Sequence, residues 1–230
     1  MYNKYMEFLL FSSVGNSYDK AILSWFGSEK KFDIFFCYYE DNEERKKLLD
    51  SLSDICIYQK GSKFQNFQKC YNKYNFDKYK YIWIVDDDIV LETEKVNELF
   101  KLAKEYNSPI SQPSMHKNGR NMQPVTINQP GNIFRYNNFI EVGVMLFRKD
   151  IIKDLLTKIG NLLNEKKLFC YGIDILCTKY YYNEKSKFII FDKIITRNPR
   201  QREKRGNKRE CFKNFNQREI VKFAGKLLNM

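Results

Sequence analysis

The chain has 230 residues, 43% of them hydrophobic and 16% aromatic, which allows one well-filled core and excludes a disordered chain. No apolar run is long enough to span a bilayer, and the short run near the amino terminus starts at Glu7, unlike a signal peptide. A cytoplasmic protein is therefore expected.

The net charge of +12 is concentrated at the carboxyl end of the chain. Residues 193–230 carry twelve Lys or Arg against three Asp or Glu, which is +9 of the total. Such a tail predicts contact with a polyanion, such as membrane phospholipid, a diphosphate or a nucleic acid.

The first half of the chain alternates apolar runs with amphipathic stretches, which predicts an α/β fold with a mostly parallel sheet flanked by helices. The expected strands cover residues 7–13, 32–39, 55–59 and 81–85. The expected helices cover residues 41–52, 63–74 and 93–106.

The second half is less regular. Residues 111–139 are polar and rich in Asn, Gln, Pro and Gly, which is typical of a hairpin or a lid. A strand over 140–147 and helices over 149–163 and 171–182 follow. The basic stretch 196–210 is expected to be a loop that orders on a ligand.

The number and spacing of the cysteines and histidines argue against a zinc site. The six cysteines form no C-x-x-C pair and His116, the single histidine, lies in the polar segment, so a Cys/His zinc site is not expected. His116 is expected to be exposed, and the cysteines to be reduced thiols without a catalytic role. The cysteines are Cys37, Cys56, Cys70, Cys170, Cys177 and Cys211.

Three loops are expected to share one crevice, because ligands bind at the carboxyl ends of the strands in open α/β sheets. These loops contain Ser12–Ser13, Tyr39–Asp41 and Asp86–Asp88. Asp86 and Asp88 are two positions apart, so on an extended chain they point the same way and can share one Mg²⁺ or Mn²⁺. A D-x-D motif alone is weak evidence, and a capping cluster before the next helix is the alternative. Its position after four expected strands favours the cation.

The order of several sequence blocks resembles a known family. The blocks include "SSVGNSYDKAILSWF", "FDIFFCYYED", "GSKFQNFQKCYN", "KYKYIWIVDDDIVLE", "RYNNFIEVGVMLFRKDI", "YGIDILCTKYY" and "KFIIFDKIITRNPRQ". Together they are similar to small glycosyltransferases of the GT-A fold that use nucleotide sugars. More narrowly, they resemble a plant-rich, glycosyltransferase-like family catalogued as a domain of unknown function. The resemblance covers residues 7–200.

The resemblance implies one catalytic domain over 1–195, with a nucleotide-binding half over 1–92 and an acceptor half over 93–195, then a basic loop and helix over 196–230. It implies a nucleoside diphosphate sugar donor, with UDP as the commonest nucleotide, and Mn²⁺ or Mg²⁺ on Asp86 and Asp88. For two of the donor-binding residues a structural role is the alternative: Tyr39 could be a half-buried packing residue, and Lys63 could be a solvated residue at a helix start. The implied donor-binding residues are Ser12, Ser13, Val14, Tyr39, Lys63, Gln65, Asp86 and Asp87.

Two further carboxylates are candidate catalytic groups. Glu141 lies inside an apolar run, and Asp174 follows a glycine at an expected helix start. The family resemblance favours Asp174 as the base of an inverting reaction and Glu141 as a sugar or acceptor contact, although the two roles could be exchanged. A retaining reaction is the alternative, because the sequence gives no distances. A helix cap is the alternative for Asp174.

The chain departs from the family at the segment after the last apolar run. Many relatives have a metal-binding histidine there, whereas this chain has Arg197 and Asn198. Either Asn198 supplies an oxygen to the metal, or Arg197 pairs directly with the diphosphate.

Residues 214–230 predict a basic amphipathic helix capped by Asn216, with Glu219 three residues later. This helix either contacts an anionic membrane that carries a lipid-linked acceptor, or packs on its own domain.

The sequence therefore predicts a metal-dependent glycosyltransferase that acts on a glycan or lipid-linked acceptor, with no nucleic-acid partner. A metal-dependent nuclease or nucleic-acid-binding protein is the alternative, and it would explain the basic tail. A dehalogenase-type phosphatase is disfavoured, because it needs D-x-D on its first strand.

Overall fold

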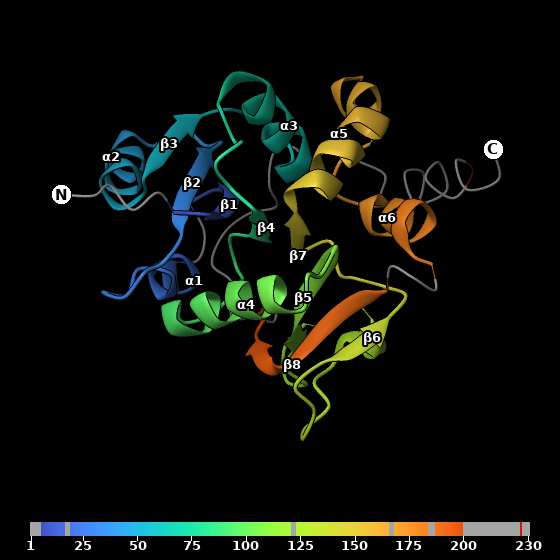
Figure 1. Ribbon diagram of the computed structural model, residues 1–230. Coiled ribbons are helices and arrows are strands. Elements are labelled where there is room, and N and C mark those ends of the chain that lie inside the picture. The colour runs from blue at the N-terminus through green and yellow to red at the C-terminus, as the bar shows by residue number, and fades with distance from the viewer. Residues whose placement is uncertain are drawn as a thin grey trace.

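The computed structural model describes residues 6–16, 19–120, 123–165, 168–183, 187–199 and 226. Eight strands form one sheet in the order β3-β2-β1-β4-β7-β5-β8-β6. Helices cover both faces of this sheet, as Figure 1 shows. The predicted α/β fold is confirmed.

The amino-terminal half forms the parallel part of the sheet, close to where its apolar runs predict. Its strands are β1 (Phe8–Val14), β2 (Asp33–Tyr38), β3 (Ile55–Tyr58) and β4 (Tyr81–Asp86). The helices between and after them are α1 (Asp19–Ser24), α2 (Glu43–Leu52), α3 (Lys63–Lys73) and α4 (Thr93–Glu105).

The carboxyl-terminal half adds strands of both directions. It comprises β5 (Ile110–Met115), a 3-10 helix η1 (Pro124–Thr126), β6 (Arg135–Asn137), β7 (Val144–Arg148), α5 (Lys149–Asn164), α6 (Ile173–Tyr181) and β8 (Phe188–Thr196). Strand β7 lies between β4 and β5 and is antiparallel to both, whereas β5 and β8 are parallel. The expected strand over 140–147 starts only at Val144.

The prediction for 111–139 was wrong at its start. This segment opens with β5, a fully buried strand inside the sheet, instead of a surface hairpin. The part that follows is attached to β8. Arg135 forms an ion pair with Asp192, and the backbone N–H of Gln129 donates to Oδ1 of Asp192 at 2.9 Å. These contacts hold the polar segment against the sheet.

Side chains alternate along the strands and separate the core into two layers. Leu9, Phe11 and Ile84 pack with α3, α5 and α6, while Leu10, Trp83 and Val85 pack with α1, α2 and α4. In Figure 1, α1 and α4 accordingly lie together, and α3, α5 and α6 lie across the sheet from them.

None of the helices in the described part of the chain is long and apolar enough to cross a bilayer. The predicted loop over 196–210, apart from residues 196–199, and the predicted helix over 214–230, apart from residue 226, lie outside the described residues. The five cysteines within the described ranges are free thiols, namely Cys37, Cys56, Cys70, Cys170 and Cys177, and Cys211 lies outside these ranges.

Candidate functional site

The carboxyl ends of β1, β2 and β4 meet at one edge of the sheet. The register pairs Ser13 of β1 with Asp86 of β4, and Val14 of β1 with Tyr38 of β2. The loops that contain Ser12–Ser13, Tyr39–Asp41 and Asp86–Asp88 therefore start side by side, as the sequence predicts.

Asp86, the last residue of β4, is paired with a buried lysine. The Nζ atom of Lys63 lies 2.8 Å from Oδ1 of Asp86 and 2.8 Å from the carbonyl oxygen of Val142. The Lys63 side chain is only 1% exposed, whereas that of Asp86 is 28% exposed. Lys63 is therefore not a solvated helix-start residue. It carries a positive charge from the first residue of α3 to the acidic end of β4.

Asp87 has a different environment from its neighbours. It is fully buried, and its Oδ2 atom accepts a hydrogen bond of 2.9 Å from the backbone N–H of Gly15. The Tyr39 hydroxyl lies 3.5 Å from the same oxygen, and a Cβ atom at position 15 would clash with that hydroxyl. The Asp87 carboxylate thus fixes the loop after β1 against the loop after β2.

Residues 141–143 lie directly against the acidic end of β4. The backbone N–H of Asp86 donates to the Gly143 carbonyl at 2.9 Å, and a Cβ atom at position 143 would lie 3.0 Å from Oδ2 of Asp86. Glu141, 9% exposed, accepts from the backbone N–H of Gln123 at 2.9 Å, and its own N–H donates to Gln112 at 2.7 Å. The structure therefore brings Glu141 to the segment that contacts Asp86 and Lys63.

The acidic turn is joined to the end of β8. Val90 forms two backbone hydrogen bonds with Arg197, of 3.0 and 3.2 Å. The backbone of Asn198 follows and accepts from the N–H of Arg120 at 2.7 Å. Arg197 and Asn198 therefore lie beside the loop that begins at Asp88.

The aspartates do not cap the following helix. The N-cap residue of α4 is Glu92, which lies beyond the turn that contains Asp87 and Asp88. The capping alternative is therefore unsupported. His116 is half-buried instead of exposed; its Nδ1 atom accepts from the N–H of Asn118 at 3.1 Å.

Asp174 is a partly buried carboxylate in the first turn of α6. Burial raises the pKa of Asp174 to about 6, although the backbone N–H of Ile175, 2.9 Å from Oδ1, favours the charged form. The preceding Gly172 has φ 88°, a left-handed conformation that suits glycine. Four residues before Asp174, the Cys170 thiol lies within the electrostatic reach of Lys63 and Asp86. Asp174 thus follows a segment that passes beside the acidic edge.

Other predicted donor contacts are used inside the fold. The Ser12 hydroxyl donates to the carbonyl of Val85 at 2.9 Å, and the Ser13 hydroxyl accepts from Asn66 at 3.0 Å. Gln65 completes a capping box with Ser62, and its amide N–H group donates toward the carbonyls of Leu163 and Leu168. These contacts tie Gln65 to α5 and the segment after it, instead of to Asp86.

The residues at this edge fit a divalent cation that is held together with a diphosphate. Within the described ranges, no group of three or more His, Cys, Asp or Glu side chains is placed to hold a metal alone. Nucleotide sites commonly use one or two carboxylates, with phosphate oxygens and water completing the shell. Asp86 and Asp88 offer two carboxylates, and Asn198 offers an amide oxygen from the adjoining segment.

Sequence reasoning missed Gly15 and Gly143, which allow the close packing around Asp87 and Asp86. A glycine two positions after a predicted strand, as at position 15, is a signal that could have been used. The backbone carbonyl of Val142, which holds Lys63, carries no sequence signal at all.

No protein-family model matches the chain, and no curated protein matches its sequence. Solved structures do share its fold. S. aureus TarS 1-349 in complex with UDP-GlcNAc has a TM-score of 0.55 and 10% identity, over 97% of this chain and 65% of that one. GalNAc-T7 with UDP, GalNAc and Mn2+ has a TM-score of 0.66 and 7% identity, over 96% of this chain and 48% of that one.

Both neighbours are GT-A glycosyltransferases, and the likeness shows that this chain has a fold of that kind. The chain spans less than two thirds of the length of these structures. The narrower resemblance to a plant-rich family stays a prediction.

Proposed function

We propose that the chain is a metal-dependent glycosyltransferase that moves a sugar from a nucleoside diphosphate sugar to a glycan or lipid-linked acceptor. The observation that supports this proposal most is the meeting of three strand ends at Asp86 and Asp88, in a fold of the GT-A kind. Carboxyl edges of this type are where open α/β sheets bind their ligands. UDP is the nucleotide that we propose, because both structural neighbours above were solved with UDP or UDP-GlcNAc.

Lys63, Asp88 and Arg197 are proposed to position the diphosphate. Because Oδ1 of Asp86 already holds the Lys63 ammonium, Asp88 carries the larger share of metal ligation, with Asp86 and Asn198 beside it. When bound, Mn²⁺ or Mg²⁺ neutralises charge on the leaving diphosphate. Arg197 lies on the adjoining segment and can pair with phosphate oxygens directly.

The loops of the 1–92 half are proposed to enclose the nucleotide. Ser12, Ser13 and Val14 shape the end of β1, and Tyr39 with Asp87 fixes the backbone of Gly15. Gln65 contributes by capping α3, which positions Lys63. These side chains act by holding the loop geometry, and the acceptor is assigned to the 93–195 half.

Asp174 is proposed as the general base of an inverting reaction. A carboxylate with a pKa of about 6 is largely ionised at pH 7 and is a better proton acceptor than an ordinary aspartate. The acceptor oxygen bonds to the anomeric carbon and gives its proton to Asp174. The sugar–diphosphate bond breaks and its electron pair leaves with the nucleoside diphosphate. Glu141 is assigned to the acceptor or the sugar.

The test is a thermal-shift panel of nucleotides and nucleotide sugars, with and without Mn²⁺. We expect UDP or a UDP-sugar to raise the melting temperature only with Mn²⁺, by several degrees near saturation. Asp88→Ala should lose this shift, whereas Asp50→Ala, an exposed change on α2, should keep it. No shift with any nucleotide, together with strong binding to single-stranded nucleic acid, would overturn the proposal and favour a nucleic-acid-binding protein.

A further inference from the structure

A cavity with several charged residues in its lining lies at the opposite edge of the sheet. It has a volume of about 310 Å³, which is at the lower end of the range for small-molecule sites. Tyr81 and Arg148, which face each other in the register of β4 and β7, lie at its centre. The cavity is at the start of β4, whereas Asp86 ends that strand, so the two sites are roughly 15 Å apart along it. The cavity is lined by Lys80, Tyr81, Lys104, Asn107, Arg148, Lys149 and Asp150.

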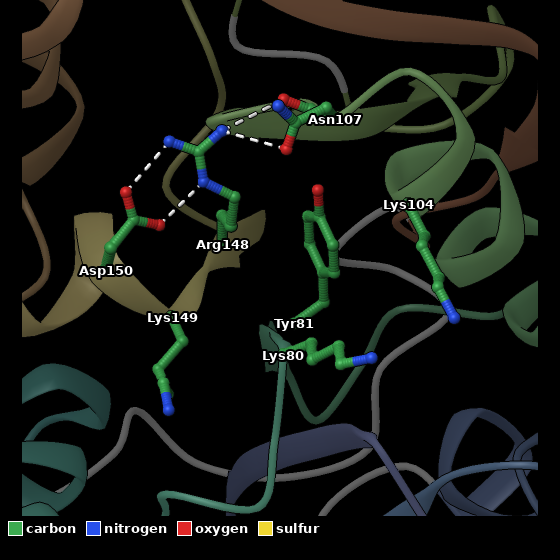
Figure 2. Close-up of a pocket in the computed structure, with 7 residues that line it drawn as sticks. All are labelled: Lys80, Tyr81, Lys104, Asn107, Arg148, Lys149 and Asp150. Carbon is green, nitrogen blue, oxygen red and sulfur yellow. Dashed lines mark hydrogen bonds and ion pairs between the residues drawn. The ribbon is translucent and has the colours of Figure 1, made fainter.

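Arg148 forms a fixed positive wall of this cavity. Its Nε and Nη2 atoms bind the two carboxylate oxygens of Asp150 at 2.6 and 2.8 Å. Its Nη1 atom donates to the carbonyl and the side-chain oxygen of Asn107, each at 3.1 Å. Asn107 has φ 45°, a left-handed conformation that turns the chain after α4 toward Arg148. The guanidinium is thus held in place before any ligand arrives (Figure 2).

Tyr81 supplies an unused donor at the centre of the cavity. The residue is 3% exposed, and its hydroxyl makes no hydrogen bond with any residue in the described part of the chain. Burial raises the pKa of Tyr81 to about 12, so the hydroxyl keeps its proton at neutral pH. Figure 2 shows the ring between Arg148 on one side and Lys104 on the other. The hydroxyl is therefore able to donate to an acceptor that enters the cavity in place of water.

The positive charge around the cavity exceeds the negative charge of the carboxylates that pair with it. Lys80 and Lys104 share the single carboxylate of Glu7, and Lys149 donates to the backbone carbonyl of Asp77 at 2.9 Å, with its Nζ atom 3.9 Å from Oδ1 of Asp77. Each ammonium carries three donors, so these contacts leave N–H groups for a ligand. The four cations of the lining meet three carboxylates, Asp150, Glu7 and Asp77, which leaves one positive charge in excess. The donors that remain for a ligand come from Lys80, directly before β4, and from α4 and α5.

We propose that this cavity binds a small phosphate-bearing anion, a phosphate monoester or a diphosphate group, through Lys80, Lys104, Lys149 and the Tyr81 hydroxyl. Donors from several directions suit a tetrahedral phosphate, which offers more acceptor oxygens than a carboxylate. The binding is independent of the nucleotide-sugar site, because the two sites lie at opposite edges of the sheet. The phosphate belongs either to a soluble compound or to a lipid headgroup.

The experiment is calorimetric titration of the full chain with pyrophosphate and with inorganic phosphate, at constant ionic strength set by chloride. Lys104→Ala should weaken pyrophosphate binding at least about tenfold, because one charge-assisted hydrogen bond is lost. Tyr81→Phe should weaken it by about three- to tenfold. Lys95→Ala is the matched control, since Lys95 is also on α4 and is also 49% exposed with one glutamate partner.

Asp88→Ala separates the two sites, and it should leave pyrophosphate binding to this cavity unchanged. Sedimentation with vesicles that contain phosphatidic acid, whose headgroup is a phosphate monoester, distinguishes the sources. Binding that is lost in Lys104→Ala but kept in Lys95→Ala assigns the phosphate to a lipid, and titration without vesicle binding assigns it to a soluble compound. The proposal is overturned if Lys104→Ala and Tyr81→Phe bind pyrophosphate like the native chain. Binding that disappears in Asp88→Ala alone, or no binding at millimolar pyrophosphate, would also overturn it.

Discussion

The buried ammonium of Lys63 lies 2.8 Å from Oδ1 of Asp86 and joins the start of α3 to the end of β4. Replacing Lys63 with Met keeps most of the volume and removes the charge. We expect a loss of about 2 kcal/mol in the free energy of unfolding, less than for a fully buried pair because Asp86 keeps contact with water. A double-mutant cycle with Asp86→Asn, measured by urea unfolding, should give a coupling of about 1 kcal/mol or more.

The control for this cycle is Lys60→Met, which removes an exposed lysine 3.2 Å from Asp41. Exposed ion pairs contribute little, so its effect on the free energy of unfolding should be much smaller than that of Lys63→Met. Equal effects of Lys60→Met and Lys63→Met would show that the buried pair has no special role.

Asp174→Asn should separate catalysis from stability. The pKa of Asp174 is raised from 3.8 to about 6 in the folded chain, so the folded state holds this proton more tightly than the unfolded chain. The stability that comes from protonation is fully present below pH 3.8 and is lost as the pH rises through about 6. Above pH 6, Asp174→Asn should therefore be more stable than the native chain, by at most about 3 kcal/mol.

Melting curves at pH 4, 6 and 8 measure this effect, and the difference should vanish toward pH 4. Transfer by the native chain should fall below about pH 6, and Asp174→Asn should lose about a hundredfold or more of it. Asp150→Asn is the control with the opposite expected change in stability. Because Arg148 lowers the pKa of Asp150, this variant should be less stable than the native chain at neutral pH. If Asp174→Asn is less stable than the native chain at every pH, Asp174 acts as a helix cap instead.

Asp87→Asn and Asp88→Asn make the same chemical change at neighbouring positions with different environments. Asp87 is fully buried and its carboxylate accepts from the backbone N–H of Gly15. Removing its charge weakens this hydrogen bond, so Asp87→Asn should lower the free energy of unfolding by about 1–3 kcal/mol. Asp88 is partly exposed, so Asp88→Asn should melt near the native temperature and lose metal-dependent nucleotide binding. Thermal melts with and without UDP and Mn²⁺ measure both effects. The reverse pattern would exchange the assigned roles.

The ion pair of Arg135 with Asp192 should hold the polar segment on the sheet. The Asp192 side chain is 0% exposed and that of Arg135 is 15% exposed, so Asp192→Asn leaves a cation without its charge partner. We expect a loss of about 2–4 kcal/mol and faster proteolysis within residues 123–135. Asp154→Asn is the control, at an exposed pair with Lys158, and its amide oxygen can still accept from the Tyr181 hydroxyl, so it should change the stability little and leave the cleavage unchanged. Unchanged cleavage in Asp192→Asn would contradict the anchoring role.

The parallel half of the fold is predictable from the sequence, because β1 to β4 are continuous apolar runs that need no partner to be recognised. Strand β5 is different, since its sequence "ISQPSM" contains poor strand formers. Two of its polar side chains bond with distant residues: Gln112 accepts from the N–H of Glu141, and the Ser114 hydroxyl donates to the carbonyl of Ile194. The register shifts between Pro113 and Ser114, where the ladder is interrupted beside a residue that lacks an N–H.

The candidate site is likewise predictable from the sequence only in part. The D-x-D motif is recognisable because three charges end an apolar run. The burial of Lys63 is not, because it depends on the carbonyl of Val142, 79 positions away in the sequence. Long-range contacts of this kind decide which polar side chains are buried and which face a ligand.

The backbone bridge between Val90 and Arg197 determines where the basic end of the chain leaves the fold. Residues 200–230 carry ten Lys or Arg and three Asp or Glu, and their covalent attachment starts beside the acidic turn. A tethered charge acts at an effective concentration set by the length of the tether, on the order of millimolar for short flexible linkers. An anion bound near Asp88 thus shares one molecule with these ten cations, at a ratio that dilution of the protein does not change.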